Sequence, residues 1–243
     1  MNRKQFLTRS VLLAAGSGLL KIASANTPVQ HAAGTELLVN AGIAGNNTNN
    51  LLKRIYTDCL AHQPTLTILM IGTNDMNNGK HVPLEKFRNN LNMLSDRIIN
   101  SGSQLMLMTI LPFYEPYLLL RHPVAFFQPE GPEGRRKQVN EVIIKTAAER
   151  KAGLLDIGSI FEKVGKIGLE KDCLLRNKEN SGKEDGVHPT REGYRFLALA
   201  VSQYIQYNHH DARRIVCFGD SITKGDGSVD KESYPAYLKK LLS

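Results

Sequence analysis

Apolar residues along the chain follow two alternating patterns. Short apolar runs, several of them rich in β-branched residues, are separated by longer stretches in which apolar residues recur every three or four positions. The short runs are typical of buried strands in a parallel sheet, and the longer repeats are typical of amphipathic helices. The predicted strands are Glu36–Val39, Leu66–Ile71, Gln104–Leu111, Gly153–Ile157 and Ile215–Phe218.

Helical spacing occupies the intervals between these runs. The predicted helices lie around residues 51–60, 84–98, 139–147, 159–166, 190–204 and 234–242. Because strands alternate with helices throughout, we expect an α/β fold in which helices cover both faces of a parallel sheet. No internal repeat or linker interrupts residues 26–243, so we expect a single domain there.

Residues 112–134 break this alternation, because they are rich in proline and aromatic side chains. A long loop in a compact domain is usually functional or locally packed. Its aromatic residues are candidates for substrate binding, namely Phe113, Tyr114, Tyr117 and Phe126.

The first 25 residues have the composition of a secretory signal peptide. A basic start precedes the apolar run Val11–Leu20 and the A-x-A pattern of Ala23–Ala25. The run is too short to span a bilayer, and no cysteine follows the cleavage pattern, so we expect neither a stable membrane anchor nor lipoprotein processing. Arg3-Lys4 resembles a weakened twin-arginine signal, while an ordinary general-secretion signal is the alternative. Either route predicts cleavage near Ala25 and an extracytoplasmic protein.

The charge of the chain reflects this leader in part. The formal net charge of +8 falls to +4 without residues 1–25, which carry four basic residues and no acidic one. The rest of the chain has no basic stripe with interleaved aromatic residues, which argues against nucleic acid as a partner.

The cysteines do not indicate a cofactor. Cys59, Cys173 and Cys217 lack metal-ligand spacing, and Cys217 lies inside an apolar run typical of a core strand. We therefore expect no metal site and no cofactor.

Ser221 is the first candidate for chemistry, because it follows the strand Ile215–Phe218 after Gly219-Asp220. Ligands of open α/β sheets bind at the carboxyl ends of the strands, where this serine would lie. The alternative is a strand-to-loop turn in which Ser221 or Asp220 bonds its own backbone.

Asp185-x-x-His188 places an acid and a base on one tight turn. The aspartate can bond one imidazole nitrogen and leave the other for Ser221, as ester hydrolysis by a serine requires. A turn that merely leads into a helix is the alternative, and a metal site is disfavoured because no other His or Cys lies at ligand spacing.

Donors for a developing oxyanion come from two other strand ends. Asn74 follows the strand Leu66–Ile71, and Gly45 lies after the first strand, where a missing side chain admits a substrate oxygen to a backbone N–H. An Asx turn at Asn74 and a plain left-handed turn at Gly45 are the alternatives. The backbone N–H of Ser221 would be the third donor.

Together these residues resemble the four sequence blocks of the SGNH (GDSL) hydrolase family. The blocks are Gly219-Asp-Ser-Ile222, Asn40-x-Gly-x-x-Gly-Asn46, Gly72-Thr-Asn-Asp75 and Asp185-x-x-His188-Pro189. By matching position, the resemblance implies that Ser221 is the nucleophile, His188 the base and Asp185 its orienting acid. It further implies an oxyanion hole made by Ser221 N–H, Gly45 N–H and the Asn74 amide.

The family fold implied is a flavodoxin-like, three-layer α/β/α sandwich with a five-stranded parallel sheet. In the family the serine block comes first, whereas here it comes last, which indicates a circular permutation. The serine strand would then lie between the first and second strands, giving the order first, last, second, third, fourth. Triads are defined by geometry and occur in several chain orders, so the implied roles are unaffected.

The function expected is that of a secreted serine esterase acting through an acyl-enzyme on short acyl groups, such as acetyl on a small-molecule or carbohydrate ester. A lipid-directed esterase or lysophospholipase is an alternative, with the aromatic segment 113–127 as the wall of the acyl pocket. A non-catalytic carbohydrate-binding protein of the same fold is a further alternative, disfavoured by the intact Ser221, His188, Asp185 and Asn74.

Overall fold

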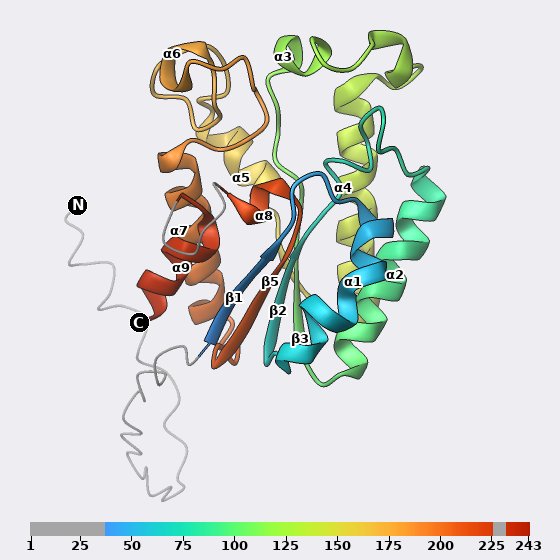
Figure 1. The fold of residues 1–243 in the computed structure, drawn as a ribbon, viewed down its shortest axis with the longest axis vertical. Coiled ribbons are helices and arrows are strands. Elements are labelled where there is room, and N and C mark those ends of the chain that lie inside the picture. Colours follow the sequence, from blue (N-terminus) through green and yellow to red (C-terminus); the bar gives the residue numbers. More distant parts are fainter. Residues whose placement is uncertain (1–36, 226–231) are drawn as a thin grey trace, which may run out of the picture. The chain divides into compact units, whose positions relative to one another are not determined.

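A parallel sheet organises residues 37–225 and 232–243, the part of the chain that the computed structural model describes (Figure 1). The strands are β1 (Leu37–Gly42), β2 (Leu66–Met70), β3 (Gln104–Met108), β4 (Gly153–Leu155) and β5 (Arg214–Gly219). Their spatial order is β1-β5-β2-β3-β4, and all neighbours are parallel. The predicted α/β fold and the position of the last strand between the first two are confirmed. The predicted signal peptide, residues 1–25, lies outside the described residues.

Helices connect the strands in the predicted alternation. The longer ones are α1 (Thr48–Asp58), α2 (Leu84–Asn100), α4 (Gly131–Arg150), α5 (Ile157–Val164), α7 (Arg191–Tyr207) and α9 (Tyr234–Leu242). The shorter ones are η1 (Leu60–His62), α3 (Glu115–Leu119), η2 (Val124–Phe127), α6 (Lys178–Ser181) and α8 (Ser221–Lys224). Across the described ranges, none of them has both the length and the apolar character required to cross a membrane.

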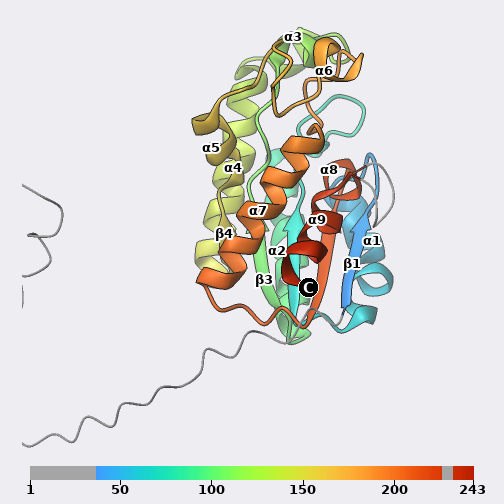
Figure 2. The same ribbon diagram turned by 90° about the vertical axis from the view of Figure 1, so that its left-hand side faces the viewer.

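Two apolar layers hold the helices to the sheet, because successive side chains of a strand point to opposite faces. Leu69 of β2 and Phe218 of β5 pack with α1, α2 and α4 on one face. Ile68 of β2 and Cys217 of β5 pack with α5, α7 and α9 on the other. Figure 1 shows the two sets of helices on either side of the sheet, and Figure 2 shows α7 and α9 in front of it. The three-layer sandwich follows from this alternation.

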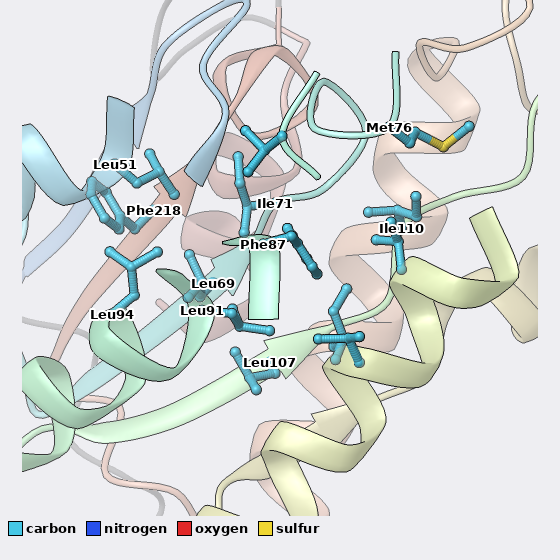
Figure 3. Packing of buried hydrophobic residues seen from close by; sticks show 14 of the residues in the cluster. Leu51, Leu69, Ile71, Met76, Phe87, Leu91, Leu94, Leu107, Ile110 and Phe218 are labelled. Atoms are coloured by element: carbon cyan, nitrogen blue, oxygen red, sulfur yellow. The ribbon is translucent and has the colours of Figure 1, made fainter. Parts of the chain in front are cut away.

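The layer beneath α1 and α2 is packed around the last strand. Figure 3 shows Phe218 of β5 beside Leu51 of α1, with Leu94 of α2 nearby. All three side chains are fully buried. Burial of such side chains stabilises a fold by about 1.5–3 kcal/mol each, so β5 is anchored where it approaches the site.

Side chains cap the start of two helices. The Asn47 side chain accepts from the backbone N–H of Asn50, whose own side chain accepts from the N–H of Asn47. Thr190 accepts from the N–H of Gly193 at the start of α7. Caps of this kind satisfy N–H groups that have no partner within the helix.

The aromatic segment 112–134 differs from the loop expected from the sequence. It contains α3, η2 and the first turn of α4. Pro116 and Pro132 lie in the first turns of α3 and α4, where a missing N–H costs nothing, so proline signals a helix start there rather than a loop. Phe127 is fully buried, so the segment is packed against the domain.

Candidate active site

Ser221 is positioned by a buried strand of the sheet. Four consecutive residues of β5, Ile215–Phe218, are at most 1% exposed, and Ser221 opens α8 immediately beyond the strand. Gly219 allows the turn because a Cβ there would lie 2.3 Å from Thr223 Oγ1 and 2.4 Å from the carbonyl oxygen of Met70. The serine therefore stands half-buried at the carboxyl edge of the sheet, on rigid scaffolding.

Asp185 and His188 form a tight turn ahead of α7. Asp185 Oδ1 accepts from the backbone N–H groups of Val187 and His188, both at 3.0 Å. His188 Nδ1 lies 2.9 Å from Asp185 Oδ2. Burial alone would raise the pKa of Asp185, but the bonds and charge of His188 and the backbone N–H groups outweigh it, so this pKa lies well below its usual range. The carboxylate is therefore ionised and oriented toward the imidazole.

The turn and the serine meet across the edge of the sheet. His188 Nε2 lies 2.9 Å from Ser221 Oγ, although the two residues are 33 positions apart. With Nδ1–H donated to Asp185, Nε2 is left to accept the hydroxyl proton of the serine. This chain of hydrogen bonds is able to generate a nucleophilic alkoxide.

Backbone pairing on one side holds the turn in place. Arg176 donates its N–H to the carbonyl of His188 at 2.9 Å, and its own carbonyl accepts from the N–H of Gly186 at 2.8 Å. Gly186 has a φ of 69°, in the left-handed region that glycine adopts without a steric penalty. The turn is thus fixed by a few polar contacts outside the sheet.

The aromatic segment supports the other side of the turn. The N–H of Tyr114 donates to the carbonyl of Gly186 at 2.8 Å, and Arg121 Nη2 donates to the carbonyl of Asp185 at 2.7 Å. Tyr114 and Tyr117 pack edge to face, with ring centroids 5.1 Å apart, and both flank Gly186. These two tyrosines are therefore beside the acid–base turn, as candidate substrate-binding residues must be.

The two phenylalanines predicted with them, Phe113 and Phe126, pack against other parts of the protein. Phe126 packs edge to face on His81 at 5.3 Å and under the guanidinium of Arg135 at 4.4 Å. Phe113 packs against the apolar layer beneath α1, α2 and α4. Among the described residues, no ring contact joins either phenylalanine to His188, although Phe113 immediately precedes Tyr114 in the chain.

Gly45 and Asn74 lie next to each other and next to the serine turn. The Asn74 amide donates to the carbonyl of Asn46 at 2.8 Å and lies 3.5 Å from Asp220 Oδ2. Gly45 has a φ of 78°, which explains the glycine that precedes Asn46. The structure thus brings both candidate oxyanion donors to the strand end that carries Ser221.

Two buried carboxyls adjoin these donors. The sequence suggested no role for Asp75, and for Asp220 only the alternative of a bond to its own backbone, which its contact with Ile222 matches. Asp75 is bonded by the N–H and hydroxyl of Thr48, and Asp220 by the N–H of Ile222. Burial raises the pKa of each carboxyl to about 6, and the charge of Asp75 contributes to the shift at Asp220. The sequence offers one indication of their importance: Asp75 follows Asn74, and Asp220 precedes Ser221, within the motifs.

Metal ligands do not gather at this site. Within residues 37–225 and 232–243, no group of three or more His, Cys, Asp or Glu side chains is arranged to hold an ion. The chemistry described above uses the side chains of the protein itself.

Comparison with known proteins identifies the family. Residues 16–196 match the GDSL-like lipase/acylhydrolase family, a match that covers well over half of the chain. The chain belongs to this family. The family match stops before β5 and Ser221.

A curated relative matches part of the chain. The chain is 34% identical over 113 residues to YqeF of Bacillus subtilis, which is named an uncharacterised lipoprotein; the match covers 42% of the chain and 46% of YqeF. The chain therefore matches less than half the length of that relative.

Solved structures of esterases share the fold of this chain. Axe2, an acetylxylan esterase from Geobacillus stearothermophilus, is 26% identical with a TM-score of 0.51, over 68% of this chain and 69% of Axe2. The acetyl xylan esterase AlAXEase is 21% identical with a TM-score of 0.55, over 68% of this chain and 79% of its own, a likeness of fold alone.

Proposed function

We propose that the protein is a serine esterase in which Ser221 is the nucleophile, His188 the general base and Asp185 the acid that orients it. The hydrogen-bonded series from Asp185 through His188 to Ser221 Oγ carries this proposal. Each member has the position its role requires, with the base between acid and nucleophile.

The reaction proceeds in two steps. Ser221 Oγ attacks the ester carbonyl carbon while His188 Nε2 takes the hydroxyl proton. The tetrahedral intermediate then collapses: the bond to the leaving oxygen breaks, and His188 returns the proton to the departing alcohol. Water repeats the sequence on the acyl-enzyme, which releases the carboxylic acid and regenerates Ser221.

The negative charge on the carbonyl oxygen requires donors in the first step. We assign this role to the N–H groups of Ser221 and Gly45 and to the Asn74 amide. Among the described residues, neither backbone N–H has another hydrogen-bond acceptor. Asn74 uses one N–H for Asn46, while its contact with Asp220 is long at 3.5 Å, so the second N–H is available to a substrate oxygen.

The substrate class we propose is a short acyl ester, such as an acetyl group on a carbohydrate or other small molecule. The similarity to Axe2, named an acetylxylan esterase, supports this choice. A lipid-directed esterase is the second candidate, and the two tyrosines beside the acid–base turn favour it, because Tyr114 and Tyr117 would offer an apolar wall to a longer chain.

We also propose that the enzyme works outside the cytoplasm. The basic start, apolar run and A-x-A pattern within residues 1–25 support export, and YqeF is named a lipoprotein. Unlike a lipoprotein, this chain has no cysteine directly after Ala25 to carry a lipid, so we expect release of the protein after signal cleavage.

The order of the blocks is proposed to reflect a circular permutation. β5 comes last in the chain but lies between β1 and β2, and the family match ends at residue 196, ahead of this strand. Triad geometry is independent of chain order, so the permutation leaves the proposed roles intact.

Initial rates on aryl esters of increasing acyl length test the proposal, with the wild-type protein beside Ser221→Ala. We expect a preference for short chains and a loss of about 10⁴-fold or more in turnover for the variant, with unchanged circular dichroism. A long-chain preference would favour the lipid-directed enzyme. Absence of turnover by the wild type on every ester would favour a non-catalytic binding protein, and full activity of folded Ser221→Ala would exclude Ser221 as the nucleophile.

A further inference from the structure

Arg54, in the second turn of α1, lies beneath the candidate oxyanion donors without reaching the triad. Its side chain is only 12% exposed. The guanidinium donates to the carbonyl of Ala41 in β1 and to the carbonyl of Gly219 in β5, both at 2.9 Å. Its Nε donates to Asn46 Oδ1 at 2.8 Å. One planar group therefore joins the ends of two strands to the loop that follows Gly45.

The cation is buried among groups that fix its plane. It lies 4.5 Å from the ring centroid of Phe218, the last side chain of β5 before Gly219. Burial lowers the pKa of Arg54, and the bond and charge of Asp58 oppose this shift. A guanidinium holds its charge under such burial and presents its donors in a rigid fork, which an ammonium does not.

The acceptors of Arg54 belong to the segments that carry the proposed oxyanion hole. The carbonyl of Gly219 directly precedes Asp220 and Ser221 in the chain, and it also accepts from the N–H of Ile43. Asn46 follows Gly45, and its carbonyl holds the Asn74 amide. The proposed donors Ser221 and Gly45 are thus within two residues of a group that Arg54 contacts. The third donor, the Asn74 amide, is held by Asn46, which Arg54 contacts directly.

We propose that Arg54 is a positioning residue for the oxyanion hole, setting the separation between the Gly45–Asn46 loop and the Ser221 turn. The inference rests on the proposed function of this site. Arg54 contacts no reacting atom in the proposed mechanism; it acts by holding the donors in the geometry that the developing oxyanion needs.

The test compares Arg54→Lys with the matched variant Arg97→Lys. Arg97 also contacts α1, with Nη1 3.5 Å from the carbonyl of Leu52 and its guanidinium 5.4 Å from the Tyr56 ring, but among the described residues no hydrogen bond joins it to a strand end. Misplacement of a reacting group by about 1 Å costs up to about 10²-fold in rate. We expect Arg54→Lys to lower kcat on a short-chain aryl ester by roughly 10- to 100-fold with KM nearly unchanged, and Arg97→Lys to leave kcat unchanged.

A double-mutant cycle with Asn74→Ala separates positioning from general stability. If Arg54 acts through the oxyanion donors, the losses in kcat from Arg54→Lys and Asn74→Ala will be strongly non-additive. Additive losses, or a kcat that follows the fraction of folded protein, would overturn the proposal. Retained kcat in Arg54→Lys would overturn it equally.

Chemical rescue covers the case in which the lysine side chain disturbs the fold. In Arg54→Ala, added methylguanidinium should raise kcat while methylammonium at the same concentration should not. Equal effects of the two cations would count against the proposal. Failure of the proposed function is recognised separately, because folded Ser221→Ala would then remain active whatever the behaviour of Arg54.

Discussion

The strand that carries Ser221 and the turn that carries Asp185 and His188 reach one site by different physical means. β5 is hydrogen-bonded to a strand on each side, and its register places Gly219 beside Gly42 and Met70. The acid–base turn lies outside the sheet, and the side chain of His188 is 30% exposed. It depends on backbone contacts with Arg176 and Tyr114 and on the Arg121 side chain.

This contrast separates stability from orientation. Burial and sheet pairing fix the serine, so changes in β5 are expected to alter the free energy of unfolding. A small number of polar contacts fix the imidazole, and each contributes only about 0.5–1.5 kcal/mol to stability. Changes in the turn should therefore alter turnover much more than they alter folding.

The largest effect should come from Asp185→Asn, which tests the turn side of the contrast. The asparagine can still accept the backbone N–H groups, but it no longer favours the imidazole tautomer that leaves Nε2 free. We expect kcat per folded molecule to fall by about 10⁴-fold. Because the low pKa of Asp185 means that its carboxylate also stabilises the fold at neutral pH, thermal unfolding should shift to a lower temperature as well. Asp172→Asn, at an exposed carboxylate paired with Lys166, is the control. A loss below tenfold would show that His188 is oriented by other contacts.

Asn74→Ala tests the loop between the two regions. Its amide acts on the transition-state oxyanion, and one such donor contributes roughly 3–4 kcal/mol, or about 10²–10³ in kcat. Steady-state kinetics should show this loss with KM little changed. Asn77→Ala, in the same turn with its amide on the carbonyl of Thr73, should retain kcat. A rise in KM alone would make Asn74 a substrate-binding residue instead.

Asp220→Asn tests the strand side through the pH dependence of unfolding. The pKa of Asp220 is about 6 in the folded protein against 3.8 as its ordinary value, so its stabilising contribution is complete below about 3.8 and is lost as pH rises through about 6. The asparagine variant lacks this loss. When the pH is raised from about 4.5 to about 7.5, the free energy of unfolding of Asp220→Asn should therefore rise by roughly 1–3 kcal/mol relative to that of the wild type.

Urea unfolding at the two pH values measures this change. Asp211→Asn is the control, because the pKa of Asp211 is shifted in the opposite direction. Arg213 lowers this pKa to about 2, so the contribution of Asp211 to stability is constant between the two pH values. Parallel stability curves for Asp220→Asn and wild type would show that Asp220 is ionised at no cost, and that the serine strand tolerates a buried charge.

The smallest effect should come from restoring the usual block order. Residues 1–25 are removed, Ser243 is joined by a short flexible linker to the predicted mature start after Ala25, and the chain is opened before Arg213 or Arg214. β5 keeps both neighbours in this arrangement, and loop closure changes by only about 0.6 kcal/mol per doubling of length. We expect kcat within about tenfold of wild type, or about 1.4 kcal/mol in barrier. A folded but inactive protein would contradict this expectation, because it would show that the active site forms only with the natural order of the strands along the chain.

The local pattern of the sequence determined much of this protein. Apolar runs and helical repeats predicted the alternation of strands and helices. The residues that follow strand ends singled out Ser221 and Asn74, and the Asp185-x-x-His188 spacing singled out His188. These features depend on neighbouring residues, so they can be read without the fold. The position of β5 between β1 and β2 followed only from resemblance to a family, because no local pattern specifies which strands pair.

Tertiary structure alone decided how the strand ends are joined. Nothing around Arg54 in the sequence indicates that its guanidinium reaches the carbonyls of Ala41 and Gly219, the latter 165 residues away. The same holds for Arg121 at the acid–base turn and for the raised pKa of Asp220, which depends on burial. Backbone carbonyls carry no sequence signature, and burial is a property of the assembled layers. Contacts to such groups become visible only when the chain has folded.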